Sequence, residues 1–385
     1  MSYFDPTRTG RAAASIALCM LCLLSAACRP PVPAGGASEQ LSDAGGPVDD
    51  AHLKERLDQA LLFTFTERTL SADEQAAWQI LHGVLAYGRA FQVQQDGRPV
   101  SAVELAQRGG PLRGWDVELV RDSKNQRVGL RALTAPGTKA GQGHPDQWFA
   151  VLAQAGVKRN EVFHVGGKQA TMDDFVWQVL QDVPRNADRE YSWTLIGLTT
   201  YLPTDYQWTA SDGKSWSIER LMEIELDQSL SESACGGTHR LIGMAMALDR
   251  RRAEGKPVEG VWKQAEQRIR WAVERAREFQ NPDGSFSTNY FERPASRPDL
   301  AEHLGATGHT LEFLAVSLPK EELEAPWIAR AAERLARLFE ETRDIPLECG
   351  ALYHAAHGLV LYREKRFGPV EFAPMQPVST SPATP

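Results

Sequence analysis

Histidine lies close to glycine at three points of this 385-residue chain, and at two of them cysteine is also present. The three clusters are Cys235-Gly-Gly-Thr-His239, Gly308-His309 and Cys349-Gly-Ala-Leu-Tyr-His354. Glycine at such points lets one backbone, or a ligand, approach another backbone closely. Because zinc prefers thiolate and imidazole ligands, one prediction is a zinc site made by Cys235, His239, Cys349 and His354, with His309 as a further ligand.

Two other interpretations compete with a metal site. In an oxidising compartment Cys235 and Cys349 would form a disulfide, and this is the favoured prediction for the two thiols. Alternatively, the small cysteines and glycines serve tight helix contacts, and the histidines are hydrogen-bonded residues of the core. A disulfide would still leave the histidines free to act.

An enzyme without a metal would need an acid and a base near the same positions. Histidine with tyrosine can abstract and return a proton, as in polysaccharide lyases, and the candidate residues are His239, His309, His354 and Tyr353. The candidate ligand-binding residues are Glu232, Asn289, Tyr290, Glu302 and His303. Aromatic and amide groups in the loop 281–298 suit sugar or peptide recognition, unless this loop only fills a gap between helices. The acids would otherwise be solvated residues near helix starts.

Two kinds of helix are expected to position these residues. Segments 262–279 and 328–339 carry one apolar stripe each and are amphipathic. Segments that start at 193, 239, 309 and 354 are apolar nearly all round and can be superimposed, with steps of 46, 70 and 45 residues. The tail from His357 is similar to the run from His82. Alternation of the two kinds at a period near 45 predicts an all-α fold, a closed α/α-toroid of helical hairpins whose equivalent helix ends gather at one rim. An open solenoid is the competing architecture.

Composition divides the chain into four parts. Basic residues, an apolar run from Ala12 to Leu24 and the small residues before Cys28 are typical of a lipoprotein-type signal peptide over 1–28. The alternative is cleavage after Ala27 without a lipid. We expect a disordered tether over 29–50, the toroid domain over 51–367 with a β-hairpin insertion at about 114–134, and a disordered tail over 368–385. The predicted location is a membrane-anchored lipoprotein, held by Cys28 and facing the periplasm or the cell exterior.

The helix alternation and Gln280-Asn-Pro-Asp-Gly-Ser-Phe286 resemble the α/α-toroid superfamily of terpenoid cyclases and protein prenyltransferases. Ala210-Ser-Asp-Gly-Lys-Ser-Trp216 is a weaker second copy of this turn, and the resemblance covers roughly 185–365. It implies an architecture only, because the Asp-rich motifs of the cyclases are absent. Protein prenyltransferases and lanthionine cyclases hold zinc in such a toroid through cysteine and histidine, although neither family's motif is intact here.

The chain also resembles an uncharacterised family of exported bacterial proteins, some of which are labelled Arf-directed GTPase-activating proteins. Such activators use a zinc finger of four closely spaced cysteines together with an arginine finger. Beyond the signal region this chain has only Cys235 and Cys349, which lie 114 positions apart. The label therefore does not describe the activity that these residues support.

Charge excludes one further class of function. The net charge of −8 is spread along the chain without a basic stripe, so nucleic-acid binding is not expected. The leading functional prediction is a cell-envelope binding or scaffold protein that takes an extended glycan or peptide, without a cofactor. The alternative is an enzyme, either lyase-like through histidine and tyrosine or zinc-dependent through cysteine and histidine. Metal content and the redox state of the thiols discriminate between these predictions.

Overall fold

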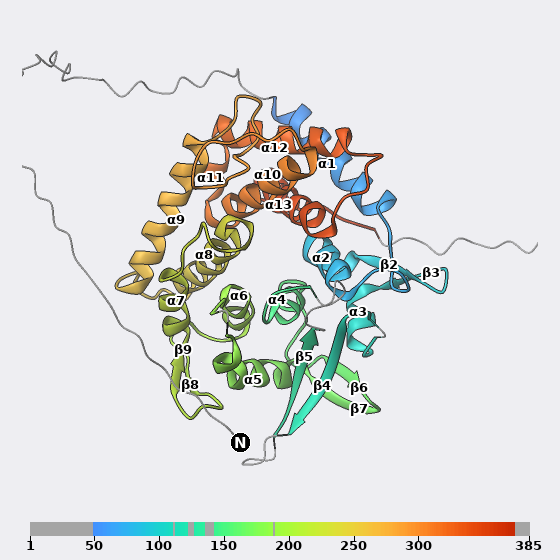
Figure 1. Cartoon of the computed structure of the whole chain (residues 1–385), viewed down its shortest axis with the longest axis vertical. Helices are drawn as coiled ribbons and strands as arrows, with labels where there is room; N and C mark the ends of the chain where they lie inside the picture. Colours follow the sequence, from blue (N-terminus) through green and yellow to red (C-terminus); the bar gives the residue numbers. More distant parts are fainter. Residues whose placement is uncertain (1–48, 111, 122–126, 135–141, 188, 374–385) are drawn as a thin grey trace, which may run out of the picture. The chain divides into compact units, whose positions relative to one another are not determined.

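Long helices make up most of the folded part of the chain (Figure 1). The computed structural model describes residues 49–110, 112–121, 127–134, 142–187 and 189–373. These residues belong to one compact unit, Gly45–Pro385. The expected signal peptide with Cys28, nearly all of the tether and most of the C-terminal tail lie outside the described residues. Within the described ranges, no helix is both long enough and apolar enough to cross a membrane.

Six central helices pack against one another in sequence order. They are α2 (Ala77–Tyr87), α4 (Gln147–Gln154), α6 (Ser192–Tyr201), α8 (Thr238–Ala253), α10 (Leu300–Ser317) and α13 (Cys349–Phe367). Each of these helices contacts the next one, and α13 contacts α2. Most residues of these helices are buried on every side, as expected for helices with apolar residues all round.

Glycine allows the closest of these helix contacts, between α10 and α13. A Cβ atom on Gly308 would lie 2.5 Å from the Cα atom of Ala355, and one on Gly358 would lie 2.9 Å from the backbone nitrogen of Glu312. The two helices therefore approach at a distance that only glycine permits. This approach brings His309 and His354, one from each helix, into a stacked contact with ring centroids 4.2 Å apart.

Amphipathic and short helices surround the central six. They are α1 (Asp50–Glu67), α3 (Ala102–Gln107), α5 (Met172–Asp182), α7 (Ile218–Leu226), α9 (Val261–Glu278), α11 (Lys320–Leu323) and α12 (Pro326–Glu341), with the 3-10 turns η1 (Gly88–Ala90), η3 (Val183–Arg185) and η4 (Ala234–Gly237). The expected stripes on 262–279 and 328–339 fall on α9 and α12, where they face the core.

A buried carboxylate at the end of α7 joins two of the central helices. Glu225 is 1% exposed and forms an ion pair of 2.6 Å with Arg240 on α8. The same carboxylate accepts hydrogen bonds from the backbone N–H of Tyr191 and from the Ser192 hydroxyl, at the start of α6. A paired buried charge of this kind fixes the positions of the groups around it. Glu225 thereby sets where α8 begins, and so where His239 lies.

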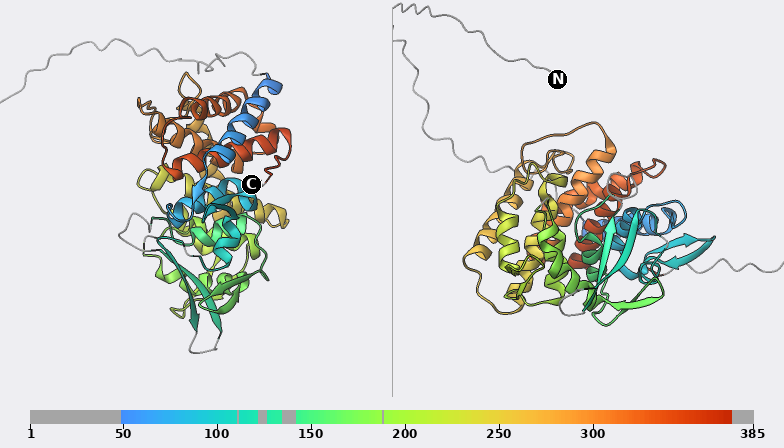
Figure 2. Two further views of the ribbon diagram at one scale, coloured as in Figure 1. Left: turned by 90° about the vertical axis from the view of Figure 1, so that its right-hand side faces the viewer. Right: turned by 60° about the horizontal axis from the view of Figure 1, so that its bottom comes forward.

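The prediction of an all-α toroid is wrong, because the described residues also form four small sheets. The nine strands are β1 (Leu70–Ser71), β2 (Gln92–Gln95), β3 (Arg98–Ser101), β4 (Trp115–Arg121), β5 (Val128–Thr134), β6 (Val162–Val165), β7 (Lys168–Thr171), β8 (Gln207–Thr209) and β9 (Ser215–Ser217). β1 pairs in parallel with β2, and the other pairs are antiparallel. The fold class is therefore mixed α/β. β4 and β5 occupy the range of about 114–134, and their hairpin lies beside β6 and β7 (Figure 2).

Turn chemistry explains why these hairpins form between helices. Asp96-Gly97 and Gly166-Gly167 each place two consecutive residues at positive φ, between strands paired in two-residue hairpins. Such turns match the twist of antiparallel strands, so they favour a hairpin over a helical connection. The segment Ala210–Trp216, assigned from sequence to a toroid-type turn, instead contains the turn between β8 and β9.

Candidate metal centre

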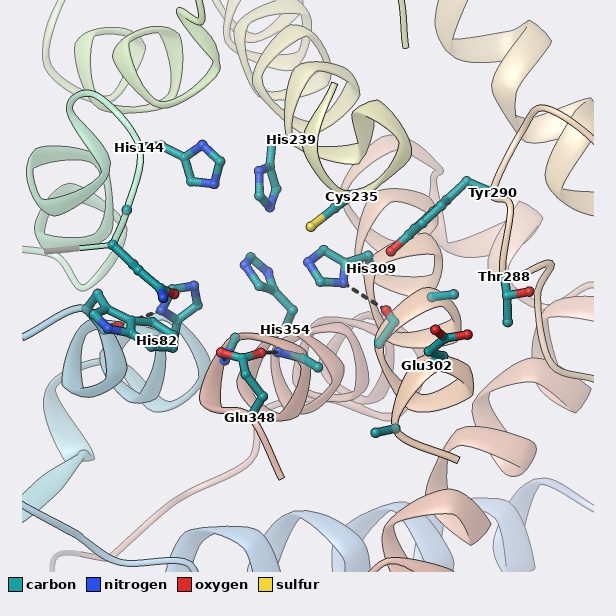
Figure 3. Close-up of a pocket in the computed structure, with 18 of the residues that line it drawn as sticks. His82, His144, Cys235, His239, Thr288, Tyr290, Glu302, His309, Glu348 and His354 are labelled. Atoms are coloured by element: carbon teal, nitrogen blue, oxygen red, sulfur yellow. Dashed lines mark hydrogen bonds between the residues drawn. The ribbon is translucent and has the colours of Figure 1, made fainter. Parts of the chain in front are cut away.

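A cavity of about 590 Å³ lies where several central helices begin (Figure 3). Its lining comes from α2, from the segment before α4, from η4 with the start of α8, and from the first turns of α10 and α13. The residues with chemical function in this lining are His82, His144, Cys235, His239, Tyr290, Glu302, His309, Glu348 and His354. Helix N-termini carry a partial positive charge, so the cavity favours anionic ligands and thiolates.

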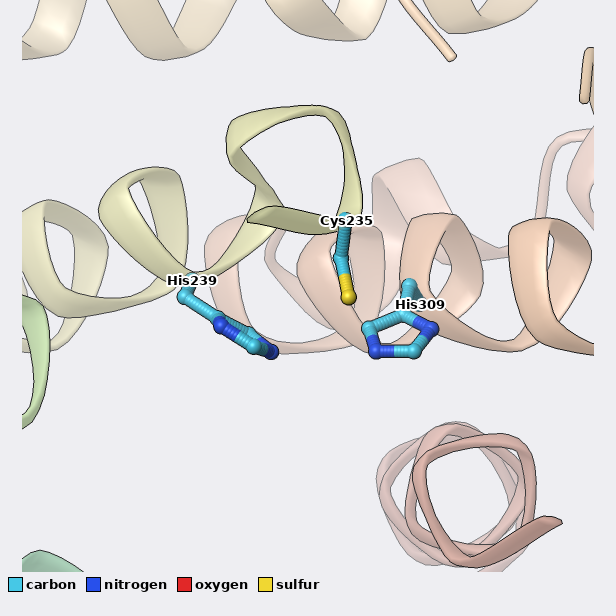
Figure 4. Close-up of side chains that lie close together, drawn as sticks. All are labelled: Cys235, His239 and His309. Carbon is cyan, nitrogen blue, oxygen red and sulfur yellow. The ribbon is translucent and has the colours of Figure 1, made fainter. Parts of the chain in front are cut away.

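Cys235 reaches this cavity through an unusual backbone turn. Cys235, Gly236 and Gly237 have φ values of +50°, +61° and +78°, directly before the first residue of α8. A left-handed conformation costs a residue with a side chain about 1–2 kcal/mol, which glycine avoids. Strain of this kind gathers at functional sites, and here it directs the sulfur of Cys235 toward His309 (Figure 4).

Three side chains offer a ligand set for one metal ion. Cys235 Sγ and one ring nitrogen each of His239 and His309 all lie within 4.8 Å of one another. Bonds of ordinary length to a tetrahedral zinc ion would place these atoms about 3.3–3.8 Å apart, which small side-chain movements can reach. A thiolate and two imidazoles select zinc or a similar transition metal over magnesium and calcium. A fourth position would remain for water or substrate, as in catalytic zinc sites.

Hydrogen bonds on Nδ1 orient three of the histidines around the cavity. His309 donates to the carbonyl of Gly305 at 2.8 Å, His82 to the carbonyl of Trp78 at 2.6 Å, and His354 to the carboxylate of Glu312 at 2.8 Å. Each bond makes the other nitrogen, Nε2, the one available to a ligand. Histidines that bind metals are held in the same way, by an acceptor on the second ring nitrogen.

Several of the remaining ring nitrogens have no partner in the described part of the chain. They are Nδ1 and Nε2 of His239, Nε2 of His309 and Nε2 of His354, all buried. A buried polar atom without a partner costs about 1–3 kcal/mol. Four such atoms beside one cavity form a costly arrangement for a structural core, and a bound metal ion would supply the missing partners.

The charges in the cavity differ from one histidine to the next. Burial opposes the charged form of His309, but the negative charge of Cys235 and that of Glu312 raise the pKa of His309 to about 9. Burial lowers the pKa of His354 to about 3, although Glu312 acts in the opposite direction. Burial and the neighbouring histidines hold the pKa of His239 well below its usual value. His239 and His354 are therefore neutral at pH 7, the form in which imidazole binds metals, whereas His309 has to release a proton when a metal ion binds.

Among the sequence candidates, His239, His309 and His354 come together with Cys235, but Cys349 does not join them. Cys235 and Cys349 are free thiols, so the expected disulfide is not formed. Cys349 Sγ accepts a hydrogen bond of 3.5 Å from Gln79, away from the lining of the cavity. Burial raises the pKa of Cys349 to about 11, which makes it an inert thiol rather than a thiolate ligand. Of the four ligands predicted for zinc, Cys349 and His354 do not belong to the group formed by Cys235, His239 and His309.

The catalytic candidate Tyr353 also lies outside the cavity lining. Tyr353 is fully buried and its hydroxyl donates to the carbonyl of Arg68 at 3.0 Å. Its ring packs edge-on against Tyr87 and Phe91. Tyr353 is therefore a core residue although it precedes His354 in sequence, because the side chains of neighbouring residues on a helix point in different directions.

The ligand-binding candidates separate into three groups. Tyr290 and Glu302 line the cavity, and Glu302 is paired with Arg297 at 3.1 Å. Asn289 lines a neighbouring groove, which shares Tyr290 with the cavity. His303 bonds to Ser296, and Glu232 is exposed; neither lines the cavity.

Four residues in or next to the cavity were not among the site candidates chosen from the sequence: His82, His144, Glu190 and Glu312. His144 precedes α4 and bonds through Nδ1 to Glu190 at 2.8 Å. His82 lies on α2 and faces His354, with ring centroids 5.1 Å apart. Glu312 was detectable as a lone acid inside an apolar helical segment, and His82 by its similarity to the run from His357.

Replacing Gly236 with alanine is expected to destabilise the protein and to disturb Cys235. The new Cβ would lie 2.2 Å from Cγ of Tyr290, at a residue whose φ is already +61°. Gly255 is the matched control, because its φ is +66° and no atom lies within 4 Å of an added Cβ. Gly255→Ala should lower the free energy of unfolding by about 1 kcal/mol through backbone strain alone, and Gly236→Ala by about 1–3 kcal/mol more. Urea denaturation measures the loss of unfolding free energy in each variant, and iodoacetamide should alkylate Cys235 at a changed rate only in Gly236→Ala.

Equal losses of unfolding free energy and equal alkylation rates in the two variants would show that Tyr290 does not pack on this turn.

Comparison with known proteins yields no relative. No protein family model matches the chain, and no curated protein sequence matches it significantly. The resemblances drawn from the sequence stay predictions, and function has to be inferred from the site itself.

Proposed function

We propose that this chain is an exported, metal-dependent hydrolytic enzyme whose metal ion, zinc or a similar transition metal, is held by Cys235, His239 and His309. The observation that carries the proposal is the convergence of these three ligand atoms within 4.8 Å beside a cavity of about 590 Å³. A binding or scaffold protein would have no use for a strained cysteine and unpartnered histidines at its cavity. A metal ion in such a site lowers the pKa of water and polarises a carbonyl group.

The residues around the ligand set suit hydrolysis. The Nδ1–H of His354 is held by Glu312, so its Nε2 is a hydrogen-bond acceptor that can orient an attacking water. The Tyr290 hydroxyl points toward His309 (Figure 3) and can donate a hydrogen bond to the oxygen that gains negative charge. Glu302 and Arg297 lie in the cavity lining and offer polar contacts to a larger substrate.

Metal analysis with matched cysteine variants tests this proposal. The purified full chain should retain at least about one zinc ion after dialysis. It should hydrolyse p-nitrophenyl acetate, lose this activity to dipicolinate and regain it with added zinc. Cys235→Ser should lose the metal and the activity, whereas Cys349→Ser should keep both, because Cys349 does not line the cavity. A protein that retains no zinc, or in which the two serine variants behave alike, would overturn the proposal.

One specific observation favours a second candidate, a thiol nucleophile. Cys235 directly precedes the N-terminal end of α8 and lies next to His309, whose Nδ1–H is fixed by the carbonyl of Gly305. A helix N-terminus and a neighbouring imidazole activate catalytic cysteines. In this case the metal-free protein would hydrolyse the ester, and iodoacetamide would abolish the activity by alkylating Cys235. The zinc-dependent protein should instead be protected from alkylation by its metal.

A further inference from the structure

We infer that the cavity holds a second metal ion, bound by His144, Glu190 and His239, so that the ring of His239 bridges two ions. This inference rests on the proposed metal site of Cys235, His239 and His309 and extends it. One ring nitrogen each of His144 and His239 and a carboxylate oxygen of Glu190 lie within 4.8 Å of one another. His239 therefore belongs to both sets of ligand atoms.

The position of the His239 ring suits a bridge. The ring lies between His144 on one side and Cys235 with His309 on the other (Figure 3). The centroid of its ring lies 4.8 Å from that of His144 and 5.6 Å from that of His309. An imidazole offers one nitrogen on each side of the ring, so it can face a ligand set on either side.

Both nitrogens of His239 need a partner. The side chain is 3% exposed, and within the described ranges neither Nδ1 nor Nε2 has a hydrogen-bond partner. A single metal ion would satisfy one nitrogen and leave the other buried alone. Each nitrogen binds one ion when the ring gives up its N–H proton to solvent, which leaves an imidazolate anion between the two cations.

The other two ligands are already arranged. His144 Nδ1 donates a hydrogen bond of 2.8 Å to Glu190 Oε2. A metal ion can replace this proton if the two atoms separate to about 3.3 Å, the spacing of tetrahedral ligands. Asn186 holds Glu190 in place, since its side chain bonds both the backbone N–H and the carbonyl of Glu190. The side chains of His144 and Glu190 are only 22% and 16% exposed, so neither is a freely moving surface group.

Charge balance supports two ions in the cavity. The thiolate of Cys235, the carboxylate of Glu190 and an imidazolate at His239 are anionic ligands for the two dications. Glu348 lines the same cavity and adds negative charge nearby, whereas the charge of Glu302 is paired with Arg297. Most of the positive charge of two ions is thereby compensated, as buried ions require.

Counting metal ions in single-histidine variants tests the second site. The full chain, loaded with Co²⁺ and dialysed, should hold about two ions per chain, and His144→Ala should hold about one. The sulfur-to-cobalt charge-transfer absorption should persist in His144→Ala and vanish in Cys235→Ser. His164, an exposed histidine of β6, provides the control, and His164→Ala should hold as many ions as the unaltered chain. In the chain loaded with copper and cobalt together, the bridging ring should couple the two spins and broaden the copper resonance.

The outcomes separate this inference from the proposed function. One cobalt ion in the unaltered chain, kept in His144→Ala, would overturn the second site and leave the first intact. Two ions in both proteins would show that His144 is not a ligand, and would also overturn it. Loss of all cobalt in His144→Ala would make His144 a ligand of a single site and overturn the bridge. A chain that binds no cobalt would overturn the proposed function as well.

Discussion

Replacing His239 with phenylalanine is expected to remove all bound metal and, at the same time, to stabilise the metal-free protein. His239 is common to both ligand sets, so its loss affects each of them. Its two nitrogens are buried without partners in the described structure. Phenylalanine replaces them with carbon, and the free energy of unfolding of the metal-free protein should rise by about 1–3 kcal/mol. Metal analysis and urea denaturation of chelator-treated protein measure the two effects.

His357 gives a matched control for this substitution. It is also a buried histidine, but its Nδ1 donates to Glu312 at 2.7 Å and it does not line the cavity. His357→Phe should keep the metal and lose stability by about 1–3 kcal/mol, because Glu312 is left with fewer partners. If His239→Phe also lost stability and kept its metal, His239 would be an ordinary core residue.

Replacing Glu312 with glutamine is expected to reduce kcat strongly while leaving the metal in place. Glu312 is 2% exposed and accepts one hydrogen bond from His354 and one from His357. Burial would raise the pKa of Glu312, but these two histidines hold it far below its usual value. An amide offers only one acceptor oxygen, so one of the two histidines must move its proton to Nε2. Where this histidine is His354, its Nε2 no longer accepts a hydrogen bond from water.

Kinetic measurements on Glu312→Gln show whether Glu312 orients His354 or only stabilises the fold. With p-nitrophenyl acetate, kcat should fall about 10²-fold, because the attacking water loses the acceptor that orients it, and KM and zinc content should change little. His357→Asn removes the other hydrogen bond of the same carboxylate and should keep most of kcat. Equal losses of kcat in the two variants would mean that Glu312 acts only through stability.

Part of this fold follows from the sequence, because helices with a regular apolar pattern are determined locally. The stripes of α9 and α12 and the superimposable segments of α6, α8, α10 and α13 are visible as periodicity. The hairpin of β4 and β5 falls in the expected insertion, but the hairpins β2–β3, β6–β7 and β8–β9 were missed, because helix alternation was extended over segments whose turn residues favour strands. Asp96-Gly97 and Gly166-Gly167 between short β-prone runs are the signals that indicate hairpins instead.

The convergence of site residues could be predicted only for residues at equivalent positions of the superimposable helical segments. His239, His309 and His354 occupy equivalent helix positions, so their convergence could be expected before the structure. Cys349 occupies a similar position but packs toward Gln79, because the direction of a side chain depends on the rotation of its helix. His144 and Glu190 lie in irregular segments before α4 and α6, where no periodicity indicates a neighbour. Contacts of this kind depend on tertiary packing and cannot be derived from spacing.

X-ray absorption at the zinc edge of the zinc-loaded full chain tests the central claim most directly. Coordination by Cys235, His239 and His309 predicts a sulfur neighbour at about 2.3 Å together with nitrogen neighbours at about 2.0–2.1 Å. The sulfur shell should disappear in Cys235→Ser and remain in Cys349→Ser. A spectrum with nitrogen and oxygen neighbours only, or a protein that retains no zinc, would contradict the account.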